Sequence, residues 1–385
     1  MKILLATDVH VNMCNGRYYF VSQVFSIVQR YYEHFGKLNV CARISHIQEL
    51  SPSFIDVTDM IDEIVAIPSL AKAMVGVYNK KIKKAVAESD FVICRCGGII
   101  SYCAAAAAKK LQKPYLAEVI SCAWDAFWNH GLVGKIVAPH IFFRTKSAIY
   151  HADYAVYVTN SFLQKRYPCK NESVGVSDVL IRPADEAVLQ KRLKKIENAD
   201  YRNITLMTTA AVDVRYKGQQ FVIKSIPKLN KAGIRVKYLL IGGGDNSYLR
   251  SVAKKYRVED QVEFAGRRTL PEVFELLDQA DFYVQPSLQE GLPRSVVEAM
   301  SRACPVIGAR TAGIPELIDE KCVVKRKSVQ EIVNAIKKFA NIDKMSELAK
   351  QNFKKSEEYE DDILTQKRNA YYEKILGEID GDKNQ

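Results

Sequence analysis

Residues 281–317 constrain the fold most, because they carry the same pattern twice. Residues 281–286 are largely apolar and stop at a proline, which is typical of a short buried strand. A loop with Glu290 follows, and then a helix. Residues 305–309 predict the next strand, and residues 312–315 form a second loop that opens a second helix. This repeat predicts an α/β fold with a parallel sheet, in which such loops lie at the carboxyl ends of the strands and bind ligands.

Two glutamates frame the first loop. Pro293 is well placed at the first helical position, so Glu290 precedes the helix and Glu298 lies inside its second turn. Backbone amides at the helix start, near Ser295, lack partners within the helix and can hold a phosphate. A carboxylate can accept two hydrogen bonds, which fits a ribose diol or a pair of sugar hydroxyls. Alternatively, Glu290 only stabilises the positive end of the helix dipole and Glu298 is a solvated charge.

The residues around these glutamates resemble the signature of the retaining glycosyltransferases of family 4, which have the GT-B fold. That signature reads E-G-[FL]-P-x-S-x-x-E, followed by a strand and a Gly-x-Pro-Glu turn. Its positions are all present in this chain, as Glu290, Gly291, Leu292, Pro293, Ser295, Glu298, Gly313, Pro315 and Glu316. The resemblance is strong over residues 205–325 and weak over the rest.

The resemblance implies two Rossmann-like domains that face a cleft. A chain of 385 residues is also too long for one ordinary core. We expect an acceptor-binding domain over residues 1–180 and a nucleotide-sugar-binding domain over residues 181–358. Residues 359–385 are expected to form a helix that packs back on the first domain and ends in a frayed tail. The charged stretch 180–200 reads as the crossover between the domains.

The implied activity is retaining transfer of a hexosyl group from a nucleotide-diphosphate sugar. The acceptor would be a glycan or a polyprenyl-linked molecule in surface-polysaccharide or glycolipid synthesis. Glu298 is expected to hold the ribose and Glu290 the sugar hydroxyls, and positive groups stabilise the departing diphosphate, so neither a metal nor a cofactor is expected. Two alternatives stay open: a GT-B sugar-nucleotide epimerase, and a non-catalytic GT-B protein that binds nucleotide sugars.

Lys217 matches the family lysine that binds the donor diphosphate, and Gly218 follows it as in the family. The family arginine sits five residues earlier, where this chain has Val212, so Arg215 is the nearest substitute. A lysine and an arginine at a helix start can neutralise a diphosphate, although an exposed basic helix start is the alternative.

Two further turns match family segments near the nucleotide. Gly243 lies in a glycine cluster after the predicted strand 237–241 and matches the family turn I-G-x-G, although a plain strand-to-helix turn is the alternative. Arg267 follows residues 262–266, which match the segment near the nucleobase. The resemblance thus assigns donor binding to Gly16, Arg215, Lys217, Gly243, Arg267, Glu290, Gly291, Leu292, Ser295 and Glu298.

The first domain opens with a strand over residues 2–8 and a loop that turns at Asn15 and Gly16. In the family this loop places glycine beside the donor phosphates and the acceptor, and here Gly16 is the glycine available. The alternative is that Gly16 only permits the turn.

An aromatic loop, SCAWDAFWNHG, follows the predicted strand 114–120. Aromatic faces suit sugar rings, and nearby carboxylates can bind hydroxyls. The family histidine that usually follows this strand is missing, and the chain looks like a subgroup with E-V-x-x-x-x-W-D found among bacterial surface-polysaccharide transferases. Core packing of the tryptophans is the alternative. Acceptor binding is expected from Trp124, Asp125 and His130, and catalysis from Glu290, Lys217, Asp125 and Glu118.

The chain carries a net charge of +12, and residues 1–175 are its more one-sided half. A basic surface suits anionic lipid, a diphosphate-linked acceptor or nucleic acid, whereas plain solubility is the alternative. Four lysines on a predicted helix over residues 74–87, and a basic aromatic helix over residues 140–151, favour docking on an anionic membrane. No nucleic-acid partner is expected.

Cysteine usage points to a reducing compartment. Nine cysteines stand without metal-binding spacing or a disulfide framework. The first apolar run is too short for a signal peptide, and no run approaches the ~20 residues that span a bilayer. We therefore expect a cytoplasmic protein, either free or peripheral on the inner face of the membrane.

Overall fold

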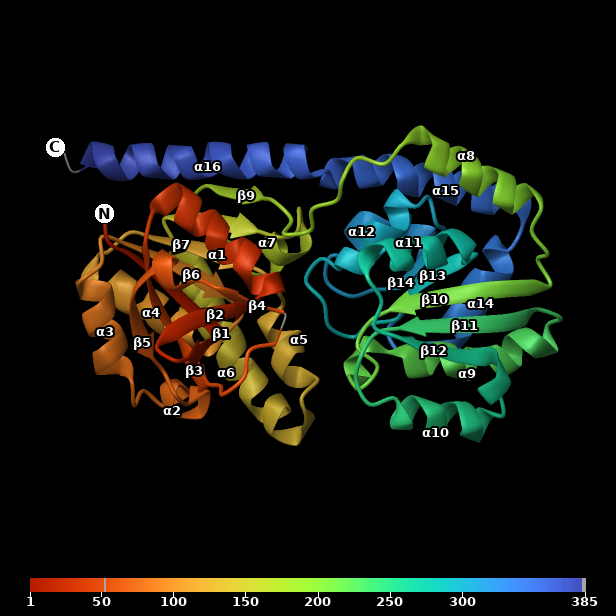
Figure 1. Cartoon of the computed structure of the whole chain (residues 1–385), viewed down its shortest axis with the longest axis horizontal. Helices are drawn as coiled ribbons and strands as arrows, with labels where there is room; N and C mark the ends of the chain where they lie inside the picture. The colour runs from red at the N-terminus through yellow and green to blue at the C-terminus, as the bar shows by residue number, and fades with distance from the viewer. Residues whose placement is uncertain (52, 383–385) are drawn as a thin grey trace. The chain divides into compact units, whose positions relative to one another are not determined.

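The computed structural model describes residues 1–51 and 53–382, and the chain forms two compact units, each with its own sheet (Figure 1). The first unit takes residues 1–176 and also includes the chain from residue 366 onward. The second unit takes residues 177–365. Both sheets are predominantly parallel and carry helices on both faces, which is the architecture that the repeat of strand, loop and helix predicts.

The sheet of the first unit reverses its strand order beside β1. From β1, the parallel strands β3 and β5 follow on one side and β6, β7, β8 and β9 on the other. Two short strands, β2 and β4, pair antiparallel beside the second half of β1. The strands are β1 Ile3–Cys14, β2 Arg17–Val21, β3 Leu38–His46, β4 Phe54–Asp56, β5 Ile61–Ala66, β6 Phe91–Cys96, β7 Tyr115–Val119, β8 Tyr154–Tyr157 and β9 Ser173–Gly175.

The loop expected after residue 8 is wrong, because β1 continues to Cys14 and turns back into β2. Residues 10–13 pair with β3, since polar and apolar side chains alternate there as in a half-buried strand. Asn15 and Gly16 form the turn with φ of 49° and 76°, as the Asn-Gly pair predicts. Gly16 therefore has a conformational reason to be glycine, and its expected place beside the donor phosphates rests on the resemblance alone.

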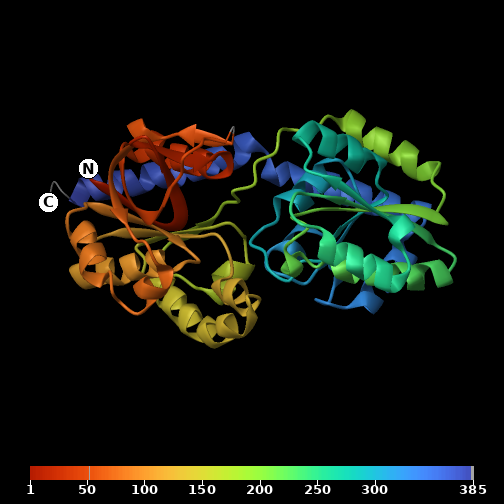
Figure 2. The same cartoon turned by 60° about the horizontal axis from the view of Figure 1, so that its bottom comes forward.

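The helices of the first unit lie in two groups (Figure 2). α4 contacts α2, α3 and α6, whereas α1 and α16 meet on the other side, where the rings of Phe35 and Tyr372 lie 5.2 Å apart. The helix expected over residues 74–87 begins only at Asn79, because Gly76 takes a left-handed φ of 87° and separates it from the short helix that ends at Met74. The helices are α1 Ser22–Phe35, α2 Leu70–Met74, α3 Asn79–Ala87, α4 Ile99–Leu111, α5 Ala123–Trp128, α6 Gly131–Tyr150, α7 Phe162–Arg166 and α16 Asp361–Asp382.

The aromatic stretch expected to be a loop is helical as well. α5 and the start of α6 occupy it, since Trp124, Phe127 and Trp128 recur at helical spacing and α5 packs on α6. The tryptophans are thus held on a helix and not on a free loop.

The sheet of the second unit is parallel in the order β12-β11-β10-β13-β14-β15. The strand order reverses between β10 and β13, as in a doubly wound fold. The repeat of strand, loop and helix expected over residues 281–317 is confirmed, although the first helix begins one residue later than expected, with Pro293 as its N-cap. The strands are β10 Asn203–Thr209, β11 Arg235–Ile241, β12 Val262–Gly266, β13 Phe282–Gln285, β14 Val306–Ala309 and β15 Val323–Val324.

Helices cover both faces of this sheet (Figure 1). α9 contacts α10 and α14 on one face, and α12 and α15 pack together on the other, where α15 also contacts α8. The helices are α8 Glu186–Glu197, α9 Gln219–Lys231, α10 Ser247–Tyr256, α11 Leu270–Gln279, α12 Arg294–Ser301, α13 Ile314–Leu317, α14 Val329–Phe339 and α15 Ile342–Ser356.

The stretch 180–200, expected to be a crossover, is built into the second unit through α8. Arg192 of α8 is 3% exposed. Its guanidinium donates hydrogen bonds of 2.6–3.2 Å to three carbonyl oxygens, which belong to Leu277, Ala280 and Arg302 at the ends of α11 and α12. A cation placed there satisfies acceptors that helix ends leave open and also matches the negative end of the helix dipole.

Two loops at the carboxyl edge of the second sheet touch through their backbones. Gly218, in the loop after β10, has a φ of 81°, and a Cβ atom there would lie 2.1 Å from the carbonyl oxygen of Pro286, in the loop after β13. The amide of Leu288 donates to the carbonyl of Tyr216 at 2.7 Å. Glycine meets both the left-handed conformation and the close approach at position 218.

Gly218→Ala should therefore destabilise the protein more than Gly233→Ala. Gly233 has nearly the same backbone, with a φ of 79°, but nothing lies within 4 Å of a Cβ atom there. Gly233→Ala is expected to cost about 1–2 kcal/mol for the backbone alone. Gly218→Ala should cost about 1–3 kcal/mol more, because the two loops must move apart. Urea unfolding gives both free energies, and equal losses would contradict the close contact of the loops.

Candidate functional site

The candidate site lies at the carboxyl edge of the second sheet, where the strand order reverses between β10 and β13. The loops that leave these two strands diverge at such a point and open a crevice for ligands. The loop after β10 brings Lys217, and the loop after β13 brings Glu290. The Nζ atom of Lys217 lies 2.9 Å from the Oε1 atom of Glu290, and the two side chains are 24% and 9% exposed. The structure thus brings together two residues that the sequence singled out separately.

A buried amide holds Glu290 in place. Gln285, the last residue of β13, is 1% exposed. Its Nε2 atom donates to the Oε1 atom of Glu290 at 3.0 Å and to the hydroxyl of Ser287 at 2.9 Å. Its Oε1 atom accepts from the hydroxyls of Tyr283 at 2.7 Å and Ser295 at 3.2 Å. Both donors and both acceptor positions of the amide are in use, so its orientation is fixed.

Sequence reasoning missed Gln285 and Tyr283. A signal was available, because Gln285 is an amide at the end of an otherwise apolar strand, and Tyr283 is a buried tyrosine whose hydroxyl needs a partner. Their hydrogen bonds reach Glu290 and Ser295, which are both expected donor-binding residues.

Glu298 lies in the second turn of α12 with a side chain that is 12% exposed. Burial raises the pKa of Glu298 above its ordinary value of 4.5, although Arg294, 3.8 Å away, offsets part of the effect. The folded protein therefore holds a carboxylate that is only partly compensated when it is charged. Hydroxyl donors of a bound ligand would supply the missing hydrogen bonds.

The start of α12 differs from the corresponding helix of the first unit. In the first unit, both carboxylate oxygens of Asp8 accept from the first amides of α4, those of Ile99 and Ile100, at 2.7 Å. Pro293 at the N-cap of α12 makes no such side-chain hydrogen bond. The chain thus supplies its own anion to the start of α4, whereas a ligand phosphate could take that place on α12.

The other expected donor residues come from neighbouring loops on the same edge. Gly243 follows β11, and a Cβ atom there would lie 2.3 Å from the Nε atom of Arg267, which follows β12. Arg215 follows β10, and its guanidinium lies 4.3 Å from the centre of the Tyr248 ring. Gly291 accepts a backbone hydrogen bond of 2.8 Å from the amide of Gly313, and Leu292 is buried beside it in sequence.

Val212, which stands at the position of the family arginine, is a buried apolar residue in the structure. Val212 is 4% exposed, and its amide donates to the carbonyl of Gly243 at 3.1 Å. Arg215 is exposed and stands three residues later, so it reaches the edge from a different point of the loop.

Glu118 has no exposed surface, which argues against direct contact with a substrate. It lies in β7, where the hydroxyl of Tyr31 donates to it, and Arg30 and Arg95 lie 3.4 and 3.7 Å away. Paired and buried in this way, the carboxylate joins α1 to two strands of the first sheet. Its expected catalytic role has no geometric support.

The acceptor residues gather on and after α5. The rings of Trp124 and Trp128 stack at 5.1 Å, and Trp124 also meets Phe142 edge-on at 5.9 Å. Trp128 is 41% exposed, His130 is exposed, and Asp125 is buried. Trp124 therefore packs against other aromatic rings, which was the alternative to acceptor binding, while Trp128 remains available to a ligand.

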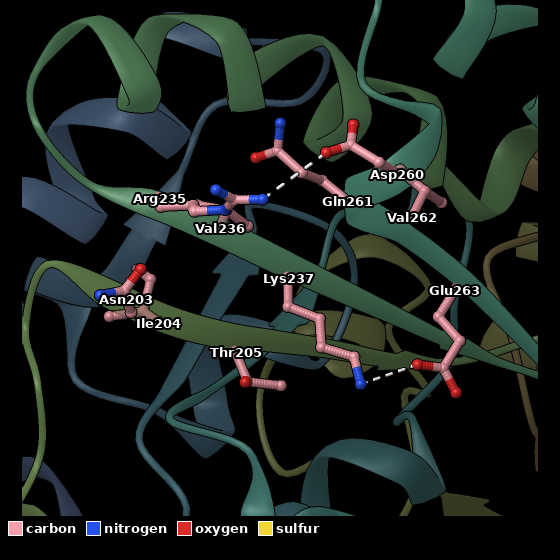
Figure 3. A pocket seen from close by; sticks show the side chains of 10 residues that line it. All are labelled: Asn203, Ile204, Thr205, Arg235, Val236, Lys237, Asp260, Gln261, Val262 and Glu263. Carbon is pink, nitrogen blue, oxygen red and sulfur yellow. Dashed lines mark ion pairs between the residues drawn. The ribbon is translucent and has the colours of Figure 1, made fainter.

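A separate pocket of about 510 Å³ opens at the amino ends of β10, β11 and β12 (Figure 3). Its charges already neutralise one another, since Lys237 lies 2.8 Å from Glu263, and Arg235 lies 3.7 Å from Asp260. Ligands of open α/β sheets bind at the opposite, carboxyl edge. This pocket is therefore not the candidate site.

Comparison with known proteins identifies the family. Residues 190–356 match the family model described as Glycosyl transferases group 1. Protein CapJ of Staphylococcus aureus is 30% identical over 351 residues, which are 87% of this chain and 85% of that protein. The chain belongs to the group 1 glycosyl transferases. The amylovoran biosynthesis glycosyltransferase AmsK of Erwinia amylovora is 29% identical to this glycosyl transferase over 158 residues, or 39% of this chain and 37% of that protein.

Solved structures of other glycosyltransferases share the fold of this glycosyl transferase. Sucrose-phosphate synthase from Thermosynechococcus elongatus has a TM-score of 0.66 at 13% identity, covering 98% of this chain and 99% of that one. HepE of Anabaena in complex with UDP has a TM-score of 0.64 at 14% identity, covering 97% of this chain and 100% of that one. The expected GT-B fold, built from two Rossmann-like units, is confirmed.

Glu298→Gln should change the pH dependence of stability in a defined direction. Because the pKa of Glu298 is raised on folding, its contribution is present below the unfolded-state pKa and is lost as the pH rises through the folded-state pKa. Replacement with glutamine removes this loss, so the stability of the variant relative to the parent should rise as the pH increases from about pH 4 upward. Urea unfolding across that range measures the trend, and a flat or opposite trend would show that the folded protein already satisfies the charge.

Proposed function

We propose that this protein transfers a sugar, with retention, from a nucleotide-diphosphate sugar to a glycan or lipid-linked acceptor in surface-polysaccharide synthesis. The observation that carries the proposal is the Lys217–Glu290 pair at the reversal of strand order, framed by the start of α12 and by buried Glu298. The donor class is supported by HepE, which has been solved with UDP and with UDP-glucose. The acceptor class is supported by AmsK, a glycosyltransferase of amylovoran biosynthesis.

Lys217 is placed to act on the leaving group. Cleavage of the bond between the sugar and the diphosphate leaves additional negative charge on the diphosphate, and a cation already in position stabilises that charge most in the transition state. Lys217 is largely buried, so its field is poorly screened by water. Arg215, from the same loop, offers a second cation. The start of α12 adds amide donors without needing to rearrange.

Glu290 changes partners when the donor binds. In the structure its carboxylate neutralises Lys217. A diphosphate would compete for the ammonium group, and the carboxylate would then be free to accept hydrogen bonds from sugar hydroxyls. Gln285 keeps its hydrogen bond to Glu290 throughout, which makes it a positioning residue. Glu298, in the second turn of α12, is left to bind the ribose.

The acceptor side of the proposal rests on Trp128 and His130 in the first unit. An exposed indole face suits a sugar ring or an apolar acceptor chain, and His130 can bind hydroxyls, whereas Asp125 is 6% exposed and is left out. Glu118 is left out because it is fully buried. Retention and membership of family 4 are proposed from the complete glutamate motif, from Glu290 to Glu298.

Lys217→Ala should lower kcat more than it raises KM for the donor, because the cation acts mainly on the charge that develops during the reaction. A loss of about 10²–10³-fold in kcat is expected for one electrostatic group of this kind. Lys237→Ala is the matched control, since Lys237 also pairs with a glutamate at 2.8 Å but lies at the opposite edge of the same sheet. Near-normal turnover of Lys217→Ala would remove Lys217 from the chemistry.

Stereochemistry and turnover together test the whole proposal. Purified protein is incubated with UDP-, GDP- or ADP-sugars, alone and with lipid-linked or free glycans, and nucleoside diphosphate release is followed. The product should keep the anomeric configuration of the donor, which NMR coupling constants report. An inverted product would overturn retention alone. Donor binding without any release, in the presence of every acceptor, would instead favour the non-catalytic alternative.

A further inference from the structure

The outer face of α6, in the first unit, carries large apolar side chains that remain in water. Leu132, Ile136 and Phe143 are 66–79% exposed, and Val133 is 75% exposed. Figure 2 shows this helix, in yellow, along the edge of the first unit. Single exposed apolar residues are ordinary, but a group on one helix marks an interaction surface.

α6 is apolar on both sides. Its inner side is buried through Ala138, Ile141 and Ile149. At about 100° per residue, Leu132, Ile136 and Phe143 fall within about 40° of one another on the outer side. An apolar stripe on a helix normally faces a core or another apolar surface. The outer face therefore fits an environment of low polarity.

The charges on α6 indicate which environment this is. Between residues 131 and 150 the chain has Lys135, Arg144 and Lys146 and no acidic residue. By helical geometry, Lys135 and Lys146 flank the apolar stripe on one side and Arg144 flanks it on the other. Their alkyl stems can lie along the stripe while the charges reach outward. An exposed apolar stripe with basic residues beside it suits the interface of an anionic membrane, where apolar side chains enter the bilayer and cations meet lipid phosphates.

Trp128, at the end of α5, extends the same surface. Its ring is 41% exposed, and the Nζ atom of Lys135 lies 5.8 Å from the ring centre. An indole has an apolar body and a polar N–H group, which suits the boundary between headgroups and acyl chains.

α3 offers a weaker surface for the same purpose, although its lysines suggested membrane docking in the sequence. Lys80, Lys81, Lys83 and Lys84 are exposed, but the apolar residues between them are buried against the unit. α3 thus presents charge without an apolar face. This makes it a useful comparison with α6.

A second copy of the chain is a poorer occupant for the α6 surface. A two-fold axis would bring together two α6 helices that each carry three basic residues and no acidic one, and like charges in contact are unfavourable. Spanning is also disfavoured, since among the helices that the structure describes none is long and apolar enough to cross a membrane.

We propose that the outer face of α6, together with Trp128, docks in the interfacial region of a bilayer that contains anionic lipid. Leu132, Ile136 and Phe143 enter the boundary of the acyl chains, and the three basic residues meet lipid phosphates. The surface follows β7 along the chain, beside the residues expected to bind the acceptor. The docking does not depend on sugar transfer and is tested without it.

Vesicle flotation and tryptophan fluorescence test the proposal together. The full chain is mixed with phosphatidylcholine vesicles, with or without phosphatidylglycerol. It should float with the anionic vesicles and should do so less at high salt. The chain has two tryptophans, Trp124 and Trp128, and both lie on α5. Their emission should therefore be quenched by brominated lipid when the protein binds. Flotation without quenching would place the contact elsewhere and overturn the proposal.

Three sets of substitutions make the test specific. Changing Leu132, Ile136 and Phe143 to Ser should lower partitioning at least about tenfold. Changing Lys135, Arg144 and Lys146 to Ser should lower it about fivefold for each charge removed. Changing the four α3 lysines to Ser is the control, which should still show lipid quenching. These side chains are exposed, and circular dichroism checks that each variant folds.

The opposite pattern would overturn the proposal. If the α3 variant fails to bind and the α6 variants bind normally, docking belongs to α3. If light scattering shows a dimer in the absence of lipid that the Leu132, Ile136 and Phe143 changes dissociate, the surface is an interface between copies. If the parent protein stays unbound with every vesicle, no membrane contact exists.

Discussion

The amide of Gln285 fixes the geometry of the loop after β13 and of the start of α12. A buried amide that uses both donors and both acceptor positions cannot rotate without losing several hydrogen bonds at once. Its partners come from β13, from the loop after it and from the first turn of α12. Glu290 is therefore held at a defined point, and Lys217 is held through it. The close contact of Gly218 with Pro286 supports the same arrangement from the backbone side.

The two units share one topology but use it differently. Each has a parallel sheet whose strand order reverses, beside β1 in the first unit and beside β10 in the second. In the first unit, Asp8 occupies the start of α4. In the second, the start of α12 has no side-chain cap, and the ion pair of Lys217 with Glu290 lies at the same edge of the sheet. This contrast favours the second unit for an anionic ligand, on grounds independent of any relative.

The proximity of the expected donor residues in the loop after β13 and in α12 could be predicted from the sequence because these residues are local. Glu290, Pro293, Ser295 and Glu298 lie within one loop and one helix, and their spacing follows from helical geometry. Lys217 could be assigned only through the family resemblance, since the pair with Glu290 joins residues 73 positions apart. Gln285 could be noticed as an amide that ends an apolar strand, but its hydrogen-bond partners are known only from the structure.

In the first unit the predictions failed where a sequence pattern is compatible with two different structures. The stretch after residue 8 alternates polar and apolar residues, as a strand does, but it also ends in Asn15 and Gly16, which signal a turn. The prediction extended this turn into a loop over the whole stretch. The aromatic stretch around Trp124 lacks an obvious cap and was read as a loop, although tertiary packing on α6 makes it a helix. Glu118 looked available because burial cannot be read from one polar residue in a strand.

The hydrogen bonds of Arg192 decide where the second unit can be separated from the rest of the chain. A fragment that starts at β10, where the first strand of the sheet begins, would lack α8 and would leave the carbonyl groups of Leu277, Ala280 and Arg302 without this cation. The loss would reach α12, since one of these carbonyls closes its carboxyl end. α8 therefore belongs to the same structural unit as the loops that carry the candidate site, and a fragment meant to keep that site must begin before Glu186.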